Sequence, residues 1–468
     1  MSRSICVHGH FYQPPRENPL TGAVPDEPSA SPFPNWNERI YDHCYRPNTE
    51  LGNFQKISFN IGATLFRWLE THKPDTYQQI IVQEHTTFQL HQTSNAIAQP
   101  YYHIILPLAS RQDKKTQIQW GLREYEHRFG HPAQGMWLPE TAVDTETMEI
   151  LAEEKVKFTI LAPWQAQTDQ LDITHPYLVE LPSGNNLTVF FYEGFLSGLV
   201  SFDPPSTRNA DEFVSQKLMP TYPPDNARNS LIMIASDGEL YGHHQRFRDQ
   251  FLSHLLDGAA NNHGINPTFP SNWLKNNPVD ERINIRPNTS WSCHHGVERW
   301  RNVCACGQYS YWKAPLRLAF NILAKSIDQV YLNYCQPYIS NPWHLRDEYI
   351  EVMLGKLSAE ELIQAHVQQK LENATLKNIE TLLKAENYRM EMFLSDAWFF
   401  EEFDRIEPRN AVQYAAYATW LVKFVTGDDL SGILKNELAF TNDSSGWTNG
   451  AQIFLDYWQI LEKNSLFL

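Results

Sequence analysis

Residues 230–244 read SLIMIASDGELYGHH, and this stretch decides the fold class. Residues 230–235 form a continuous apolar run without alternation, which is typical of a strand buried on both faces in a parallel sheet. Two acidic residues, Asp237 and Glu239, follow where this strand would end, and residues 246–256 show helical spacing. A strand that leads through a polar turn into a helix predicts a β/α unit.

The same order recurs through the first two-thirds of the chain. Further runs typical of strands cover residues 4–8, 57–60, 135–138, 157–162 and 187–192, and helical spacing appears in residues 64–70 and 145–154. Because strands alternate with helices, we expect parallel β/α units, either in an open sheet or closed into a barrel.

The last third of the chain has a different pattern. Residues 315–334 carry apolar side chains at helical spacing. Pro408 and Gly427 match the start and the end of another helix. We therefore expect an α/β catalytic domain over residues 1–285 and a mainly helical region over residues 286–468 that contributes to the rim of the active site.

The composition excludes several classes of protein. An apolar fraction of 42% is ample for a large core and excludes a mainly disordered chain. The net charge of −16 argues against nucleic-acid binding, because an acidic surface repels phosphates. The chain has no apolar window long enough to cross a membrane, no apolar signal-peptide core and only six cysteines. We expect a cytoplasmic protein without a nucleic-acid or membrane partner, and the sequence leaves its oligomeric state open.

Acidic and imidazole side chains follow several of the predicted strands. His8 and His10 follow the first strand, Glu140 follows the strand at residues 135–138, and Asp237 follows the strand at residues 230–235. Ligands of parallel β/α folds bind at the carboxyl ends of the strands, so these groups are expected to meet in one pocket. Two carboxyl groups beside aromatic side chains are what the cleavage of a glycosidic bond requires.

Each of these residues could also have a purely structural role instead of a catalytic one. Glu140 could cap a helix or pair with an arginine, and Asp237 lies in a Ser-Asp-Gly sequence that is common in turns. Glu239 is expected to hold substrate rather than to donate the proton. His8 and His10 point the same way from an extended segment and could bind a metal ion, but a pair without further ligands is a weak signal.

A second group of reactive side chains lies in residues 290–300, SWSCHHGVERW, and in the cysteines that follow. Cys293, His294, Cys304 and Cys306 could supply four zinc ligands, but their spacing is not the usual pair of C-x₂₋₄-C motifs. We therefore favour a rim of the active site with buried, reduced thiols, and we predict no metal or other cofactor.

Three segments of the sequence resemble glycoside hydrolase family 57, the α-glucan-active group of amylases, 4-α-glucanotransferases and branching enzymes. HGHFYQPP at residues 8–15 resembles the first motif of the family, although Phe11 and Tyr12 separate its His from its Gln. GMWLPET at residues 135–141 and SDGELYGHH at residues 236–244 resemble the third and fourth motifs.

The resemblance implies specific roles. Glu140 corresponds to the nucleophile of the family and Asp237 to its general acid/base, and the second motif is matched to the stretch around Glu84 and His85. The residues expected to hold the sugar are His8, His10, Gln13, His85, Trp137, Glu239, Tyr241, His243, Trp291, His294 and Trp398.

The resemblance also implies an incomplete (β/α) barrel of seven strands with a C-terminal helical region, in a less-characterised subgroup of the family. The function expected is a retaining enzyme that cleaves or transfers α-glycosidic bonds, with an oligo- or polysaccharide as its substrate. Retention requires the Glu140 and Asp237 carboxyls to lie about 5–5.5 Å apart. Two alternatives stay open: a metal-assisted glycosidase of the α-mannosidase type, and a carbohydrate-binding protein without catalytic activity.

Overall fold

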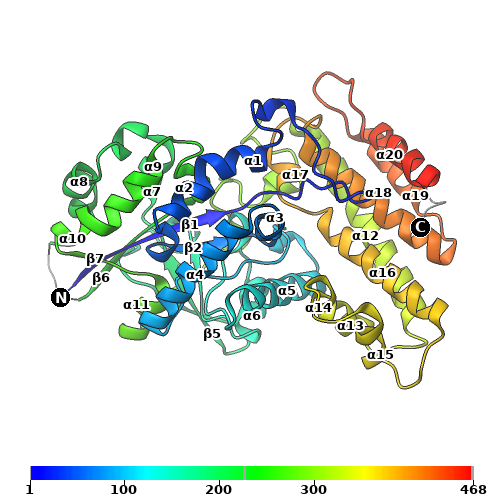
Figure 1. Ribbon diagram of the computed structural model, residues 1–468, viewed down its shortest axis with the longest axis horizontal. Helices are drawn as coiled ribbons and strands as arrows, with labels where there is room; N and C mark the ends of the chain where they lie inside the picture. The colour runs from blue at the N-terminus through cyan, green and yellow to red at the C-terminus, as the bar shows by residue number, and fades with distance from the viewer. Residues whose placement is uncertain (1, 225–227, 465–468) are drawn as a thin grey trace. The chain divides into compact units, whose positions relative to one another are not determined.

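A computed structural model describes residues 2–224 and 228–464 of the chain (Figure 1). The contacts within this part of the chain divide it into two compact units. The first unit contains the chain up to Pro15, Ala23–Tyr101 and Tyr125–Trp291, and the second contains Arg16–Gly22, Tyr102–Glu124 and the chain from Ser292 onward. The chain therefore passes between the units several times, so that residues 16–22 and 102–124 group with the C-terminal region.

A parallel sheet forms the centre of the first unit. Strand β1 (Arg3–Phe11) lies between β2 (Ser58–Ile61) and β6 (Ser230–Asp237), and β7 (Ile265–Pro267) also pairs with β1. The register places His10 opposite Asn60 of β2 and opposite Asp237 of β6. Three polar side chains from distant parts of the sequence thus lie side by side at the carboxyl end of the sheet.

The apolar runs of the sequence explain why β1 and β6 form the core. Ile5 and Val7 of β1 and Ile232 and Ile234 of β6 are at most 1% exposed. A strand buried on both faces needs apolar residues at consecutive positions, as the sequence of β6 has them. The expected α/β class is confirmed.

A second sheet contains β3 (Phe158–Leu161), β5 (Asn186–Phe191) and β4 (Tyr177–Glu180), with β3 parallel and β4 antiparallel to β5. Single parallel bridges lie between the two sheets in the sequence: Phe59 with Ala96, Ala98 with Met136, and Gly135 with Phe158. The described strands therefore form a four-stranded and a three-stranded sheet.

Helices follow the strands of the first unit. They are α1 (Trp36–Ile40), α2 (Arg46–Glu50), α3 (Ala63–His72), α4 (Pro74–His91), α6 (Thr145–Glu153), α7 (Gly194–Phe202), α8 (Ala210–Phe213), α9 (Arg248–His254), α10 (Ala260–Asn262) and α11 (Pro270–Asn276). Their starts are encoded locally: the Asp144 side chain accepts a hydrogen bond from the Thr147 backbone N–H and caps α6. Helix α5 (Arg111–Phe129) begins in the second unit and ends in the first.

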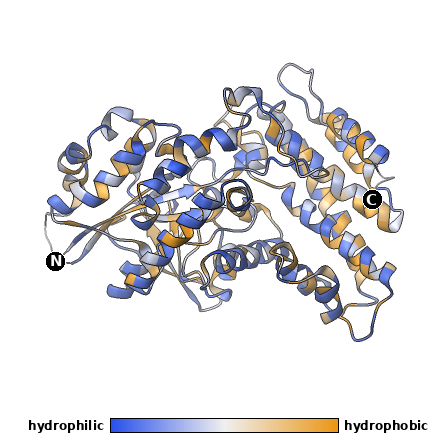
Figure 2. Cartoon of the chain, viewed as in Figure 1, coloured by the Kyte–Doolittle hydropathy of each residue, from blue (hydrophilic) through white to orange (hydrophobic). Residues whose placement is uncertain are grey.

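The rest of the second unit is helical, as expected. It contains α12 (Lys313–Cys335), α13 (Pro342–Glu348), α14 (Ile350–Met353), α15 (Ala359–Ala365), α16 (Asn373–Glu391), α17 (Asp396–Phe399), α18 (Ile406–Thr426), α19 (Ser431–Glu437) and α20 (Gly450–Asn464). Helix α18 ends at Gly427, whose φ of 79° is left-handed. Figure 2 shows hydrophobic and hydrophilic residues mixed along these helices, which is the pattern of helices that bury one face. Among the described residues, none of the helices is long and apolar enough to span a membrane.

Candidate active site

Two histidines at the end of β1 begin the candidate site. His8 and His10 are two residues apart on a strand, so their side chains leave the same face of the sheet. The ring nitrogens of His8 lie 2.9 Å from Ser58 Oγ and 3.1 Å from Asn60 Oδ1. The side-chain nitrogen of Asn60 lies 2.9 Å from His10 Nδ1 and donates to Gln99 Oε1 at 2.7 Å. Both ring nitrogens of His8 are thus engaged by protein groups rather than directed at a metal ion.

Burial keeps these histidines neutral. It lowers the pKa of His8 and of His10 to about 3, and for His8 the neighbouring His10 adds to the effect. The Trp137 indole stacks on both imidazoles, with ring centroids 4.8 Å from His8 and 5.3 Å from His10. Trp137 is fully buried, so it supports the histidines and offers no open face to a sugar.

Glu140 follows on a tight turn after Trp137. Its backbone is left-handed, with φ 57° and ψ 20°, and Thr141 also has a positive φ of 48°. Side chains other than glycine rarely adopt this conformation, and such strain is common at functional sites. The Trp291 backbone N–H donates to the Glu140 carbonyl at 3.0 Å, and the Trp291 indole N–H donates to Glu140 Oε2 at 3.0 Å. The first bond holds the backbone of the turn, and the second fixes the direction of the Glu140 carboxylate.

Asp237 stands at the end of β6, near Glu140. Burial, and to a smaller extent the charge of Glu140, raise the pKa of Asp237 to about 7. The side chain is nevertheless accessible to solvent. A carboxyl group that is desolvated and still accessible has protein atoms packed around it while part of its surface reaches solvent. Asp237 can therefore hold its proton near neutral pH and still reach a ligand.

Glu239 lies two residues further on, in the turn Gly238–Leu240, and is only 5% exposed. Its Oε1 accepts hydrogen bonds from the Tyr45 hydroxyl at 2.7 Å and from the Tyr12 backbone N–H at 3.2 Å. Burial, and then the charge of Asp237, raise the pKa of Glu239 to about 8. A protonated Glu239 has an O–H donor in addition to its acceptor oxygens.

Aromatic rings surround these groups. Trp291 is half-buried and packs edge-on against Trp137 at 5.0 Å and against Tyr192 at 6.4 Å. Tyr12 stacks with His10 at 6.2 Å. Trp291 and Tyr12 are both half-buried, so they are the rings of this group with surface left to contact a sugar.

Three other predicted sugar-binding residues of the first unit are Gln13, Tyr241 and His243. The Gln13 side chain hydrogen-bonds with Tyr45, beside Glu239. Tyr241 is 2% exposed, which leaves little of it for a ligand. His243 stacks on His43 at 5.4 Å.

The predicted sugar ligand His85 lies outside the hydrogen-bond network of His8, His10 and Asn60. His85 is exposed on helix α4 and lies 2.8 Å from the side-chain nitrogen of Gln89, one turn further along the helix. The polar side chain that reaches the histidines comes instead from Gln99, in the segment after α4.

Two predicted residues belong to the second unit. Trp398 is fully buried, its indole N–H donates to the Lys313 carbonyl at 3.3 Å, and the Arg317 guanidinium covers its ring at 4.1 Å. It is therefore part of a core, and its prediction as a sugar platform is wrong. His294 is exposed, and the imidazole that reaches the cysteines is that of His295.

The sequence analysis missed Asn60, Gln99 and Tyr45. Asn60 is the penultimate residue of β2 and Asp237 is the last residue of β6, so a polar residue near the end of a strand was the available signal. Gln99 comes from a segment that makes only single bridges, and Tyr45 from a short π-helical turn (Tyr41–Tyr45). Neither has a periodic pattern that would mark it.

Two family models match parts of the chain. A family model described as glycosyl hydrolase family 57 matches residues 16–286, and a model described as a domain of unknown function (DUF3536) matches residues 309–460. The chain is 24% identical to a 4-alpha-glucanotransferase of Thermococcus litoralis over 248 residues, which are 51% of this chain and 35% of that protein. It is 24% identical to an alpha-amylase of Pyrococcus abyssi over 249 residues, 51% of this chain and 36% of that protein. The chain spans roughly a third of the length of these two relatives.

Solved structures resemble the chain over nearly its whole length. An exo-type maltose-forming amylase from Pyrococcus sp. ST04 has a TM-score of 0.76 at 14% identity, over 98% of this chain and 88% of that one. A branching enzyme from Pyrococcus horikoshii has a TM-score of 0.62 at 13% identity, over 100% of this chain and 95% of that one. These similarities establish the fold.

Proposed function

Because the chain belongs to glycosyl hydrolase family 57, we propose that it cleaves or transfers α-glycosidic bonds in α-glucan-like oligo- or polysaccharides, with retention of configuration. The proposal depends on one observation. Glu140, which Trp291 holds by two hydrogen bonds, lies close enough to Asp237 to raise the pKa of that carboxyl. One carboxyl oriented as a nucleophile beside a second that keeps its proton is the pair that a retaining glycosidase uses.

The two carboxyls divide the chemistry in the proposed reaction. The Glu140 carboxylate attacks the anomeric carbon and forms an ester to the sugar, while Asp237 gives its proton to the departing glycosidic oxygen. Asp237, now ionised, then takes a proton from a water molecule or from the hydroxyl of a second sugar. That oxygen attacks the anomeric carbon, the ester bond breaks, and both carboxyls return to their starting states.

The groups around the pair hold the sugar. His10 and Asn60 are almost completely buried members of a neutral hydrogen-bonded network, so they support the floor of the site without disturbing the charge of Glu140. Glu239, with a pKa of about 8, can donate its proton to a further hydroxyl. Trp291 orients Glu140 and, being half-buried, leaves part of its ring for a sugar face.

We also propose that the first unit is an incomplete barrel of seven parallel segments. The single parallel bridges at Ala96, Ala98 and Gly135 support this, because they connect β2 to β3 in sequence order. The Glu193 backbone N–H, just after β5, donates to the Met233 carbonyl of β6 at 2.7 Å and supports a closing contact.

Stereochemistry tests the proposal. The purified protein is incubated with maltooligosaccharides, and proton NMR follows the first anomer released, which should be α. The variant Glu140→Ala should lose this activity, and azide should restore cleavage of an activated α-glucoside to give the β-glucosyl azide, because azide takes the place of the missing carboxylate. Release of the β anomer by the wild type, or an α-azide product from the variant, would contradict the assignment of Glu140.

A further inference from the structure

The chain from Ser292 to Trp312 is an irregular segment with a buried interior. In this fully described stretch the regular elements are two 3₁₀ turns, Glu298–Trp300 and Ser310–Trp312. Val297 is nevertheless 2% exposed and Trp300 is fully buried. A segment without a sheet or an α-helix makes few backbone hydrogen bonds of its own, so an additional interaction is needed to hold a buried conformation.

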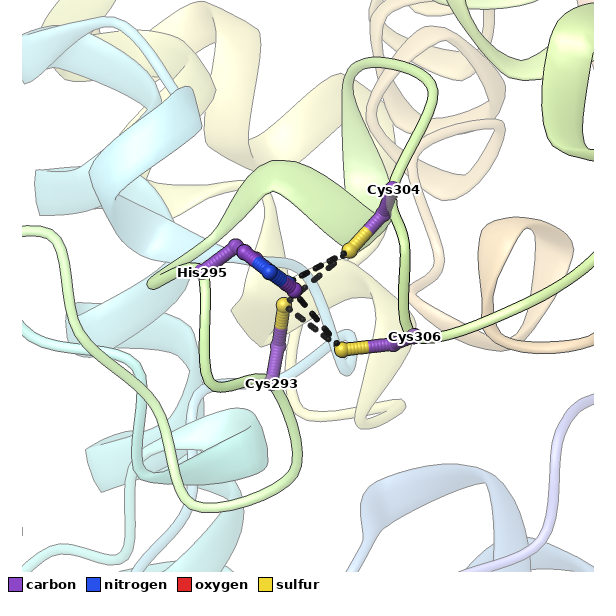
Figure 3. A group of neighbouring side chains, drawn as sticks. All are labelled: Cys293, His295, Cys304 and Cys306. Carbon is purple, nitrogen blue, oxygen red and sulfur yellow. Dashed lines mark hydrogen bonds between the residues drawn. The ribbon is translucent and has the colours of Figure 1, made fainter.

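Four metal-binding side chains of this segment converge on one point (Figure 3). Cys293 Sγ lies 3.5 Å from Cys304 Sγ and 3.8 Å from Cys306 Sγ. His295 Nδ1 lies 3.3 Å from Cys306 Sγ and 3.4 Å from Cys304 Sγ. All four donor atoms are within 4.8 Å of one another.

The four individual distances, 3.3–3.8 Å, are close to the edges of a tetrahedron around zinc. With Zn–S bonds of about 2.3 Å and a Zn–N bond of about 2.0–2.1 Å, the sulfurs lie about 3.8 Å apart and about 3.6 Å from the nitrogen. Three thiolates with one imidazole form one of the usual ligand sets of structural zinc sites. The sulfurs are too far apart to be bonded, since a disulfide has an S–S distance of about 2.0 Å.

The backbone presents the ligands in two similar turns. Cys293 and His295 precede Gly296, and the Gly296 N–H donates to the Cys293 carbonyl at 3.1 Å. Cys304 and Cys306 precede Gly307, and the Gly307 N–H donates to the Cys304 carbonyl at 3.2 Å. Each turn thus brings two donor side chains, one residue apart, to the same side. Gly296 has a left-handed φ of 80°, which explains why glycine closes the first turn.

Backbone N–H groups are also directed at the sulfurs. Those of His295 and Arg299 hydrogen-bond to the Cys293 sulfur, and that of His294 hydrogen-bonds to the Cys306 sulfur. Hydrogen bonds to sulfur stabilise negative charge on it, and a metal-bound cysteine is a thiolate.

Positively charged side chains lie next to the cysteine sulfurs. Lys313 is only 3% exposed, and it interacts electrostatically with Cys293 and Cys304 as well as with Glu401. Arg299 is close enough to repel Lys313. Three thiolates, a neutral imidazole and Zn²⁺ have a net charge of −1, which together with the Glu401 carboxylate balances the charges of Lys313 and Arg299. The buried lysine is thus accounted for by an anionic centre beside it.

We propose that Cys293, His295, Cys304 and Cys306 bind one Zn²⁺ ion and that this ion fixes the segment from Ser292 to Trp312. Binding releases the thiol protons of the three cysteines to solvent, and no oxidation or reduction is involved. All four positions of the tetrahedron are occupied by protein ligands, so the site has no place for a reacting water and is structural. The proposal is independent of the glycosidase chemistry, which belongs to the first unit.

Metal analysis of the whole chain tests the site. Protein expressed without added metal and purified in a reducing buffer without chelator is measured by inductively coupled plasma mass spectrometry, and we expect about one zinc per chain. His295→Ala and Cys306→Ser should lose it. His294→Ala is the matched control, because its imidazole is adjacent in sequence but exposed and outside the cluster, and it should keep its zinc.

Two measurements on the wild type keep the test valid if the variants misfold. Cobalt(II) in place of zinc should give the intense visible bands of a tetrahedral thiolate site. Removal of the metal should expose the segment, so that trypsin cuts after the exposed Arg301 about tenfold faster. Two outcomes would overturn the proposal: fewer than about 0.1 zinc per chain after reduction and incubation with zinc chloride, or a disulfide between Cys293 and Cys304 in protein that holds no metal.

Discussion

Each unit of the molecule contains a cluster of desolvated carboxyl groups, and the two clusters differ in whether arginines pair with them. In the first unit, burial and neighbouring carboxylates raise the pKa of Asp237 to about 7 and of Glu239 to about 8. In the second unit, Asp113 lies 2.7 Å from Arg389 and 3.1 Å from Arg346. Burial alone would raise the pKa of Asp113, but the two arginines outweigh it, and the pKa is below its ordinary value. For Glu386, which pairs with Arg346, burial outweighs the arginines and raises the pKa to about 7, so Asp113 is the carboxyl of this cluster that the contrast concerns.

The difference separates carboxyl groups that can transfer a proton from carboxyl groups that stabilise the fold. A carboxyl that is to give and take a proton near neutral pH must be desolvated without a cation that would fix its charge. A carboxyl that holds helices together is ionised and paired, as Asp113 of α5 is with Arg389 of α16 and Arg346 of α13. Removing a charge from the first cluster should therefore alter activity, and removing one from the second should alter stability.

The largest expected effect is on catalysis. Asp237→Asn cannot donate a proton to the leaving oxygen, so kcat for a maltooligosaccharide should fall by about 10³-fold while the fold is kept. The loss should be much smaller with an aryl glucoside whose leaving group needs no proton. Asp172→Asn, in a surface ion pair with Arg228, is the control and should keep its activity. An Asp237→Asn variant within tenfold of the wild type on the unactivated substrate would show that another group is the acid.

The second effect is on stability. Arg389→Met removes one of the two arginine partners of Asp113, at 2.7 Å, and the guanidinium that lies 2.8 Å from Asp328. It leaves the buried Asp113 and the half-buried Asp328 with less compensating charge. The free energy of unfolding of the second unit, measured with denaturant, should fall by about 3–5 kcal/mol. Arg282→Met breaks an ion pair with Glu180 that is largely exposed. This control should cost less than about 1 kcal/mol, and equal losses in the two variants would remove the distinction between the clusters.

Much of this architecture could be predicted from the sequence because its signals are local. The apolar run of β6 and the helix stop at Gly427 are each encoded within a few residues. The register of β1 with β2 is not local, and it alone brings Asn60 to His8 and His10. The sequence could name the strand ends but not the side chains that meet there.

In the cysteine segment, too, the sequence could not identify the side chains that meet, although the residues concerned are close together in the chain. His294 and His295 are adjacent in the sequence, and only the backbone turn that ends at Gly296 decides which imidazole faces the sulfurs. His295 does, which makes the ligand pairs Cys-x-His and Cys-x-Cys. Spacing rules derived from C-x₂₋₄-C motifs do not cover such pairs.

The smallest expected effect is a gain of stability that depends on pH. Glu239 has a pKa of about 8 in the folded chain and an ordinary value of 4.5. The unfolded chain therefore releases this proton first, and Glu239 lowers stability progressively as the pH rises from about 4.5 to 8.

In Glu239→Gln, an amide oxygen can still accept from Tyr45 and Tyr12, and no charge has to be buried. The variant should match the wild type at pH 4 and exceed it by no more than about 4 kcal/mol at pH 8, measured by denaturant unfolding at both pH values. Glu84→Gln is the matched control, since Glu84 is equally buried but is paired with His131 and Ser94, and it should gain nothing. A Glu239→Gln variant less stable than the wild type at pH 8 would mean that Glu239 is ionised and stabilising, like Asp113 of the second unit.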